Sequence, residues 1–85
     1  SLNRSELARL ERAFAEMGLE YLPSYGNFSL VRVGKAAEVY EGLLRAGVIV
    51  RPVAGYGLPE WLRVSVGLPE ENDRFLAALR HLVGR

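Results

Sequence analysis

The sequence contains no cysteine, only one histidine and only one lysine, and it lacks a long apolar run. Without cysteine it can form no disulfide, thiolate nucleophile or cysteine-based metal site. The single histidine, His81, provides no metal site, since zinc takes three or four ligands. The apolar runs are far shorter than the roughly 20 residues that span a bilayer, and the N-terminus has no signal-peptide pattern. We therefore expect no metal, no membrane partner and a cytoplasmic location.

The sequence also lacks a marked excess of positive or negative charge. Eleven basic and ten acidic residues give a net charge of +1, and the two kinds alternate along the chain. The pI is about 8.1, whereas a nucleic-acid-binding domain usually exceeds about 9 and carries a basic stripe. An RNA-binding sheet would also need several aromatic residues on its central strands, and Phe28 alone is too few. We expect no nucleic-acid partner.

The composition does allow a folded domain. The chain has 85 residues, of which 49% are hydrophobic, and this content favours a packed globule over disorder. A chain of this length makes one domain, so residues 1–85 are interpreted as a single unit. A domain of this size buries only about 60% of its unfolded surface, which leaves a thin margin of stability.

Apolar spacing predicts three helices. Leu7, Leu10, Phe14 and Met17 recur at steps of three and four, which predicts a helix over residues 4–17. A second helix is predicted over residues 36–46, with Gly47 after it. Pro69 suits the first turn of a third helix, although Leu68 before it is a weaker cap than Ser or Thr.

Extended segments are predicted at residues 19–22, 28–33, 48–50 and 61–66, with a loop over 52–59. The order of elements is therefore α-β-β-α-β-β-α. This order predicts an α+β fold, a two-layer sandwich in which a small, mostly antiparallel sheet carries helices on one face. The strand–helix–strand unit around the second helix would supply any parallel pair.

Arg63 is the residue with the most chemical interest. Its strand neighbours are apolar, so its guanidinium is expected to emerge from a partly dry surface. Arginine stays charged and binds carboxylate or phosphate with a planar fork. The residues alone leave two interpretations open, an anion clamp or a surface salt bridge. Arg51, which follows the third predicted strand, is in the same way either a site residue or a solvent-exposed loop residue.

The other candidates have plainer explanations. Glu70 and Glu71 are adjacent and do not face each other on a helix, so they serve the charge of a helix N-terminus better than acid–base catalysis. Lys35 is interpreted as a solvated lysine at a helix start. Tyr25 and Tyr56 lie in loops beside glycines, where they could cover a ligand or only pack on the surface.

Three stretches together resemble the C-terminal small domain of histidinol-phosphate aminotransferases, pyridoxal-phosphate enzymes of the aspartate aminotransferase fold type. Residues 22–31 read Leu-Pro-Ser-Tyr-Gly-Asn-Phe-Ser-Leu-Val. Residues 47–52 read Gly-Val-Ile-Val-Arg-Pro, and residues 58–67 read Leu-Pro-Glu-Trp-Leu-Arg-Val-Ser-Val-Gly. Their order and spacing resemble the family over nearly the whole chain.

The resemblance implies roles for two arginines. In the wider fold type the arginine matching Arg63 binds the substrate carboxylate, and in the histidinol-phosphate enzymes it is implied to bind the substrate phosphate. Arg51 matches a second arginine near the same site. Asn27 matches a family motif without an assigned ligand contact. The implied substrate is a phosphorylated amino alcohol, histidinol phosphate, which exchanges an amino group with 2-oxoglutarate or glutamate in histidine biosynthesis.

The resemblance also implies what this chain leaves out. The Schiff-base lysine and the other residues that bind pyridoxal phosphate belong to the family's large domain, and Lys35 does not match that lysine. We therefore expect no catalytic, cofactor-binding or metal-binding residue here, no turnover by the chain alone, and a homodimeric full-length enzyme. The alternatives are another enzyme of this fold type, such as an aromatic aminotransferase or a threonine-phosphate decarboxylase, and a free-standing α/β interaction module.

Overall fold

The computed structural model describes residues 2–23, 27–48, 50–52 and 57–84. Within them, helices and strands follow one another in the predicted α-β-β-α-β-β-α order. The elements are α1 (Leu2–Glu16), β1 (Tyr21–Pro23), β2 (Phe28–Arg32), α2 (Ala36–Arg45), β3 (Arg51–Pro52), β4 (Trp61–Ser65) and α3 (Pro69–Gly84). The α+β fold class expected from the sequence is confirmed.

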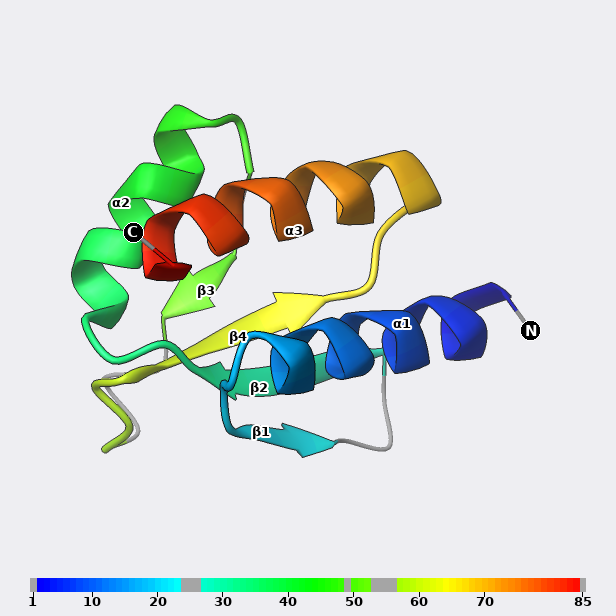
Figure 1. Cartoon of the computed structure of the whole chain (residues 1–85), viewed down its shortest axis with the longest axis horizontal. Helices are drawn as coiled ribbons and strands as arrows, with labels where there is room; N and C mark the ends of the chain where they lie inside the picture. Colours follow the sequence, from blue (N-terminus) through cyan, green and yellow to red (C-terminus); the bar gives the residue numbers. More distant parts are fainter. Residues whose placement is uncertain (1, 24–26, 49, 53–56, 85) are drawn as a thin grey trace.

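The four strands form one sheet in the order β1-β2-β4-β3. All three pairings are antiparallel. The last strand along the chain, β4, lies between β2 and β3, so the strand–helix–strand unit around α2 gives no parallel pair in the described sheet. In Figure 1, α1 and α3 run side by side across this sheet. The sheet and its helices thus make two layers.

Alternation along β2 and β4 sets which side of the sheet meets the helices. In β2, Ser29 and Val31 are buried, and in β4, Leu62 and Val64 are buried, while the residues between them are more exposed. Side chains of a strand point to opposite faces in turn. The buried set packs against apolar residues of the helices, including Leu10 and Phe14, to form the core. The other side of the sheet is called the open face below.

Glycine ends both of the first two helices by the same motif. After α2, Gly47 has φ +82°, its N–H donates to the carbonyl of Leu44 at 2.9 Å, and the Val48 N–H donates to Leu43 at 2.8 Å. This is a Schellman motif, which satisfies the last carbonyls of a helix. Because the motif engages Val48, the strand predicted over residues 48–50 is wrong in place: neither Val48 nor Val50 is in a strand, and β3 comprises Arg51 and Pro52, of which Pro52 was expected in the loop.

The start of α3 is better capped than Leu68 suggested. The Leu68 N–H donates to Oε1 of Glu71 at 2.8 Å. With Pro69 as the first helical residue, Glu71 is the third, so this bond is half of a capping box. The Glu71 carboxylate therefore accepts the hydrogen bond of the backbone N–H before the helix. Leu68 has no side-chain oxygen that could accept the second bond of the capping box.

Phe14 is at the centre of the core, with none of its surface exposed. Its ring lies 6.1 Å from that of Phe75 in an edge-to-face arrangement, and 6.3 Å from that of Tyr21. These contacts join α1 to α3 and to the sheet.

We predict that Phe14→Ala lowers the free energy of unfolding by about 3–5 kcal/mol, since it removes an aromatic ring from a closed core. The matched change Leu44→Ala, at a side chain that is 42% exposed, should cost only about 0.5 kcal/mol. Urea denaturation followed by Trp61 fluorescence measures both. Equal costs would contradict the assignment of the core.

Candidate anion-binding site

Arg63 and Arg51 lie directly opposite each other on neighbouring strands. Arg63 is the middle residue of β4, Arg51 is the first residue of β3, and the two are register partners. Register partners point to the same face of a sheet. Leu62 and Val50, the residues just before them, are buried on the helix side, so both arginines project from the open face. The structure thus brings together the two arginines singled out in the sequence.

The two arginines differ in burial. Arg63 is half-buried and Arg51 is exposed. Within the described ranges, neither guanidinium forms an ion pair with a carboxylate. Like charges directly opposite each other on a sheet are destabilising, so this pair is unfavourable unless an anion lies between the two groups.

A third arginine on the same face shows the opposite arrangement. Arg32 of β2 contacts Oε1 of Glu60 through Nη2 at 2.7 Å and Oε1 of Glu20 through Nη1 at 3.3 Å. The hydrogen bonds that the Arg32 side chain donates to Glu60 and, as the second cause, to Glu20 raise the pKa of Arg32. The charge of Arg32 is therefore compensated within the chain, which makes it a natural control for Arg63.

Phe28 supports the guanidinium of Arg63. The central carbon of the guanidinium, Cζ, lies 4.3 Å from the centre of the Phe28 ring, within the range of a cation–π contact. The Nε atom of Arg63 is buried without a hydrogen-bond partner. The residues alone did not indicate this contact, because it depends on which strand β2 pairs with.

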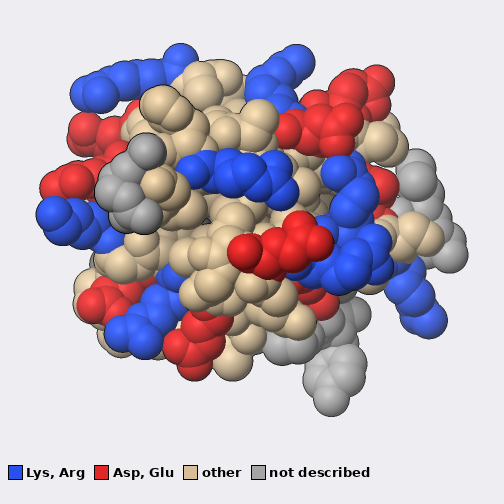
Figure 2. Space-filling view, in the orientation of Figure 1, with Lys and Arg blue, Asp and Glu red and all other residues tan. Residues whose placement is uncertain are grey.

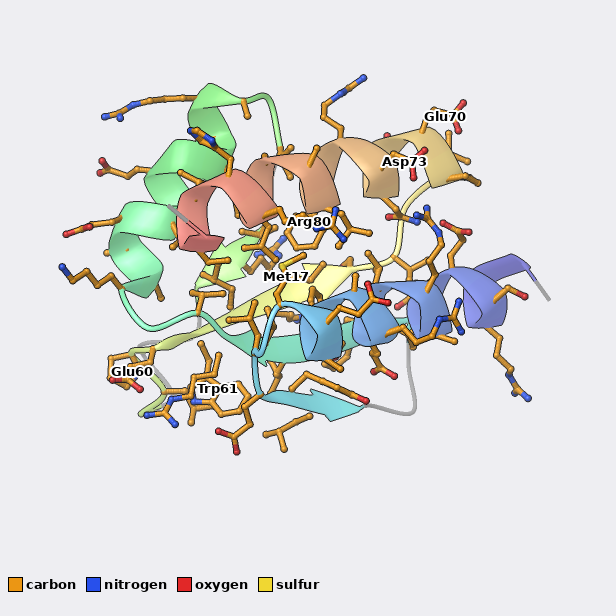
Figure 3. The ribbon with its side chains drawn as sticks, viewed as in Figure 1. Met17, Glu60, Trp61, Glu70, Asp73 and Arg80 are labelled. Atoms are coloured by element: carbon orange, nitrogen blue, oxygen red, sulfur yellow. The ribbon has the colours of Figure 1, made fainter. Side chains whose placement is uncertain are left out.

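The surroundings of the two arginines are apolar. Leu22 and Leu30 continue the row that Arg63 and Arg51 form across the sheet, and Leu22 is 46% exposed. Trp61 lies on the side of the sheet away from α3 (Figure 3). None of these three side chains belongs to the core cluster or packs against it. The open face therefore combines an apolar surface with two uncompensated positive charges.

The remaining sequence candidates do not join this site. His81, Lys35, Glu70 and Glu71 are all exposed and lie on α3 or at the start of α2. Tyr25 and Tyr56 lie outside the described residues. No group of three or more potential metal ligands occurs among the residues that the structure describes.

Charges elsewhere are mixed. On the face in view in Figure 2, basic and acidic side chains are interspersed over the helices. None of the described helices is long and apolar enough to cross a membrane. Asn27, which the family motif contains, is exposed and accepts a hydrogen bond from the Val66 N–H through its backbone oxygen at 2.8 Å.

Comparison with known proteins identifies the family. The sequence profile described as aminotransferase class I and II matches residues 3–79. The chain belongs to the aminotransferase class I and II family. It is 58% identical to histidinol-phosphate aminotransferase 2 of Pseudomonas fluorescens, over 99% of this chain but 23% of that protein. This aminotransferase chain thus spans about a quarter of the length of the relatives that it matches.

Two solved structures match the fold of this chain over part of their length. L-threonine-O-3-phosphate decarboxylase from Porphyromonas gingivalis matches with a TM-score of 0.86 and 25% identity, over 96% of this chain and 27% of that chain. Histidinol-phosphate aminotransferase from Sinorhizobium meliloti, in complex with pyridoxal-5'-phosphate, matches with a TM-score of 0.76 and 29% identity, over 96% and 24%. The likeness to each covers nearly all of this aminotransferase chain.

The cofactor of such aminotransferases does not fit the residues described here. An enzyme of this chemistry holds pyridoxal phosphate through a lysine and a partner for the pyridinium nitrogen. The one lysine of the chain, Lys35, is exposed at the start of α2. It lines a groove with residues of α2 and α3, whereas Arg63 projects from the open face. The chain's one lysine thus lines a different surface from the one that carries the arginine pair.

A polar network fixes the connection between β4 and α3. Asn72 bonds both backbone groups of Gly67, accepting from its N–H at 3.0 Å and donating to its carbonyl at 3.0 Å. Its Nδ2 also donates to Oε1 of Glu6 at 2.9 Å, and Arg9 donates to the same oxygen at 2.7 Å. Arg9 in turn pairs with Asp73 at 2.8 Å. The network ties α1 to the end of the strand that carries Arg63.

The hydrogen bonds from Arg9 and, next, from Asn72 lower the pKa of Glu6. A carboxylate whose pKa is lower in the folded than in the unfolded state stabilises the fold above the unfolded-state pKa. That contribution is lost as the pH falls through the folded-state pKa.

We predict that Glu6→Gln makes the free energy of unfolding less dependent on pH between about pH 5 and pH 3. Glu41→Gln is the control, since Glu41 is exposed and lies 3.7 Å from Arg45 in a solvated pair. Denaturation at several pH values measures the slopes. The same slope for Glu6→Gln and the unsubstituted chain would contradict a role for the carboxylate.

Proposed function

We propose that the chain, as the single domain of residues 1–85, is the C-terminal small domain of a pyridoxal-phosphate-dependent aminotransferase. The full-length enzyme would transfer an amino group between L-histidinol phosphate and 2-oxoglutarate or glutamate in histidine biosynthesis. In this proposal Arg63 and Arg51 bind the substrate phosphate. The chain contributes substrate binding, and the residues that hold the cofactor and act on the reacting atoms belong to the rest of the enzyme.

One observation carries the proposal, the opposition of two guanidinium groups without a carboxylate between them. Arg51 and Arg63 are register partners, while Arg32 on the same face is paired with two glutamates. A phosphate monoester carries close to two negative charges at neutral pH and has three acceptor oxygens. Two arginines can therefore share it by charge-assisted hydrogen bonds, which are the strong class.

The names of the relatives support phosphate rather than carboxylate as the bound group. One structural match is to an enzyme named for histidinol phosphate and another to an enzyme named for L-threonine-O-3-phosphate. Both compounds carry a phosphate ester. The 58% identity to a histidinol-phosphate aminotransferase, against 25% to the decarboxylase, favours histidinol phosphate as the substrate.

In this proposal the domain binds and orients the substrate. Pyridoxal phosphate, when bound by the rest of the enzyme, supplies the electron sink for transamination. Arg63 and Arg51 would fix the phosphate end of the substrate, and a fixed end holds the reacting carbon in a productive position. The apolar residues around them would exclude water when the open face meets the rest of the enzyme, which strengthens the ionic contacts.

Further parts of the proposal concern the whole enzyme. We expect the chain alone to bind no pyridoxal phosphate and to show no turnover, because its one lysine is remote from the arginine pair. We expect a homodimeric enzyme in the cytoplasm, where a charged phosphate ester is retained by the membrane.

The second candidate function is decarboxylation of a phosphorylated amino acid, since the L-threonine-O-3-phosphate decarboxylase has the higher TM-score of the two matches, 0.86 against 0.76. A panel of histidinol phosphate, threonine phosphate and aromatic amino acids, offered to the full-length enzyme, separates these activities. If the chain were instead a free-standing interaction module, its open face would not need a large domain to cover it.

We predict that Arg63→Lys in the full-length enzyme raises KM for histidinol phosphate, because a point charge replaces a bidentate fork. Arg63→Gln should raise it about 10- to 100-fold, the range for loss of a charged hydrogen bond, and should weaken competitive inhibition by inorganic phosphate similarly. Arg32→Lys is the matched control and should leave KM unchanged. Kinetics in which Arg63 and Arg32 variants behave alike would remove Arg63 from the site.

A further inference from the structure

Phe28 and Arg63 are neighbours only because of the register between β2 and β4. Arg63 pairs with Leu30, and Phe28 pairs with Ser65 two residues further along β4. Phe28 and Arg63 are therefore diagonal neighbours on the open face, a separation that aromatic and long side chains can bridge. The 4.3 Å from Cζ to the ring centre shows that they do.

The burial of one nitrogen limits which edge of the Arg63 guanidinium a ligand can use. A guanidinium offers a phosphate either its two terminal nitrogens or one terminal nitrogen together with Nε. Nε of Arg63 is buried and has no hydrogen-bond partner among the described residues, so no substrate oxygen can reach it in this rotamer. Arg63 as a residue is only half-buried, so the donors left for a substrate are those on Nη1 and Nη2. The accessible edge is the terminal one.

A buried N–H without a partner is unfavourable, so the contact with the ring must hold the side chain in this rotamer. The long arginine side chain otherwise has considerable rotamer freedom to lose when it binds. Stacking on Phe28 removes part of that freedom before the substrate arrives. Such pre-organisation improves affinity without any contact between Phe28 and the substrate.

Resting on the function proposed above, we propose that Phe28 is a positioning residue that fixes Arg63 so that Nη1 and Nη2 alone bind the substrate phosphate, end-on. Phe28 acts through Arg63 and touches no reacting atom. Its effect is on substrate affinity and on inhibition by phosphate, and not on the chemical step.

The test is a double-mutant cycle in the full-length enzyme. Phe28→Leu should raise both KM for histidinol phosphate and the inhibition constant of inorganic phosphate about 3- to 30-fold, the range of a cation–π contact. The kcat should stay within about twofold, which is the signature of lost uniform binding. Phe28→Tyr, which keeps the ring, should restore both constants. Arg32→Lys, on the same face but at a guanidinium already paired with Glu20 and Glu60, is the control for a general change in that surface and should leave both constants unchanged.

The cycle separates the inference from the proposal beneath it. In an Arg63→Gln background, Phe28→Leu should have no further effect on either constant, because the group that Phe28 positions is gone. Additive effects, or a kcat loss that Phe28→Tyr does not restore, would overturn the positioning role while leaving Arg63 as the ligand. An Arg63→Gln enzyme with unchanged phosphate inhibition would instead overturn the proposed function. Phe28→Met provides a second non-aromatic variant in case Phe28→Leu folds poorly.

Discussion

Two guanidinium groups held opposite each other on adjacent strands are the constraint on which the account of this domain depends. The antiparallel pairing of β3 with β4 places Arg51 across from Arg63. Two like charges at that spacing weaken the sheet, so their presence on a partly dry surface is unfavourable for stability alone. An anionic ligand removes the repulsion, and a phosphate ester has the charge and the oxygens to engage both groups.

The rest of the fold keeps that pair in place. Alternate residues of β4, Leu62 and Val64, are buried beneath the helices, so a one-residue slip would turn Arg63 into the core. Asn72 holds the backbone at Gly67, just beyond the end of β4. On the other side, Phe28 of β2 supports the guanidinium itself. The buried core residues fix the face from which Arg63 projects, Asn72 fixes the backbone just beyond its strand, and Phe28 fixes its guanidinium.

The sequence was sufficient for much of the fold but for less of the site. Helical spacing and the Pro and Gly residues at element ends predicted all three helices, and apolar composition and alternation predicted β1, β2 and β4. The start of β3 was placed too early, because the Schellman motif at Gly47 engages Val48. The capping role of Glu71 was also missed, because Leu68 was judged as a cap without regard to the carboxylate three residues later.

Pairing between distant strands is the information that residue patterns do not carry. Arg63 could be recognised as unusual from its apolar neighbours, yet its position beside Arg51 and above Phe28 follows from β4 inserting between β2 and β3. The same holds for Glu6 and Asn72, which are 66 residues apart in the chain. The role of Arg63 and Arg51 as ligands stays a prediction until a phosphate is seen between them.

A crystal structure of the full-length enzyme with bound inorganic phosphate tests the central claim most directly. A phosphate is expected within hydrogen-bond distance of Nη1 and Nη2 of Arg63 and of the guanidinium of Arg51, with Nε of Arg63 still buried and Cζ still over the Phe28 ring. A phosphate bound elsewhere, with Arg63 paired to a carboxylate from the rest of the enzyme, would contradict it.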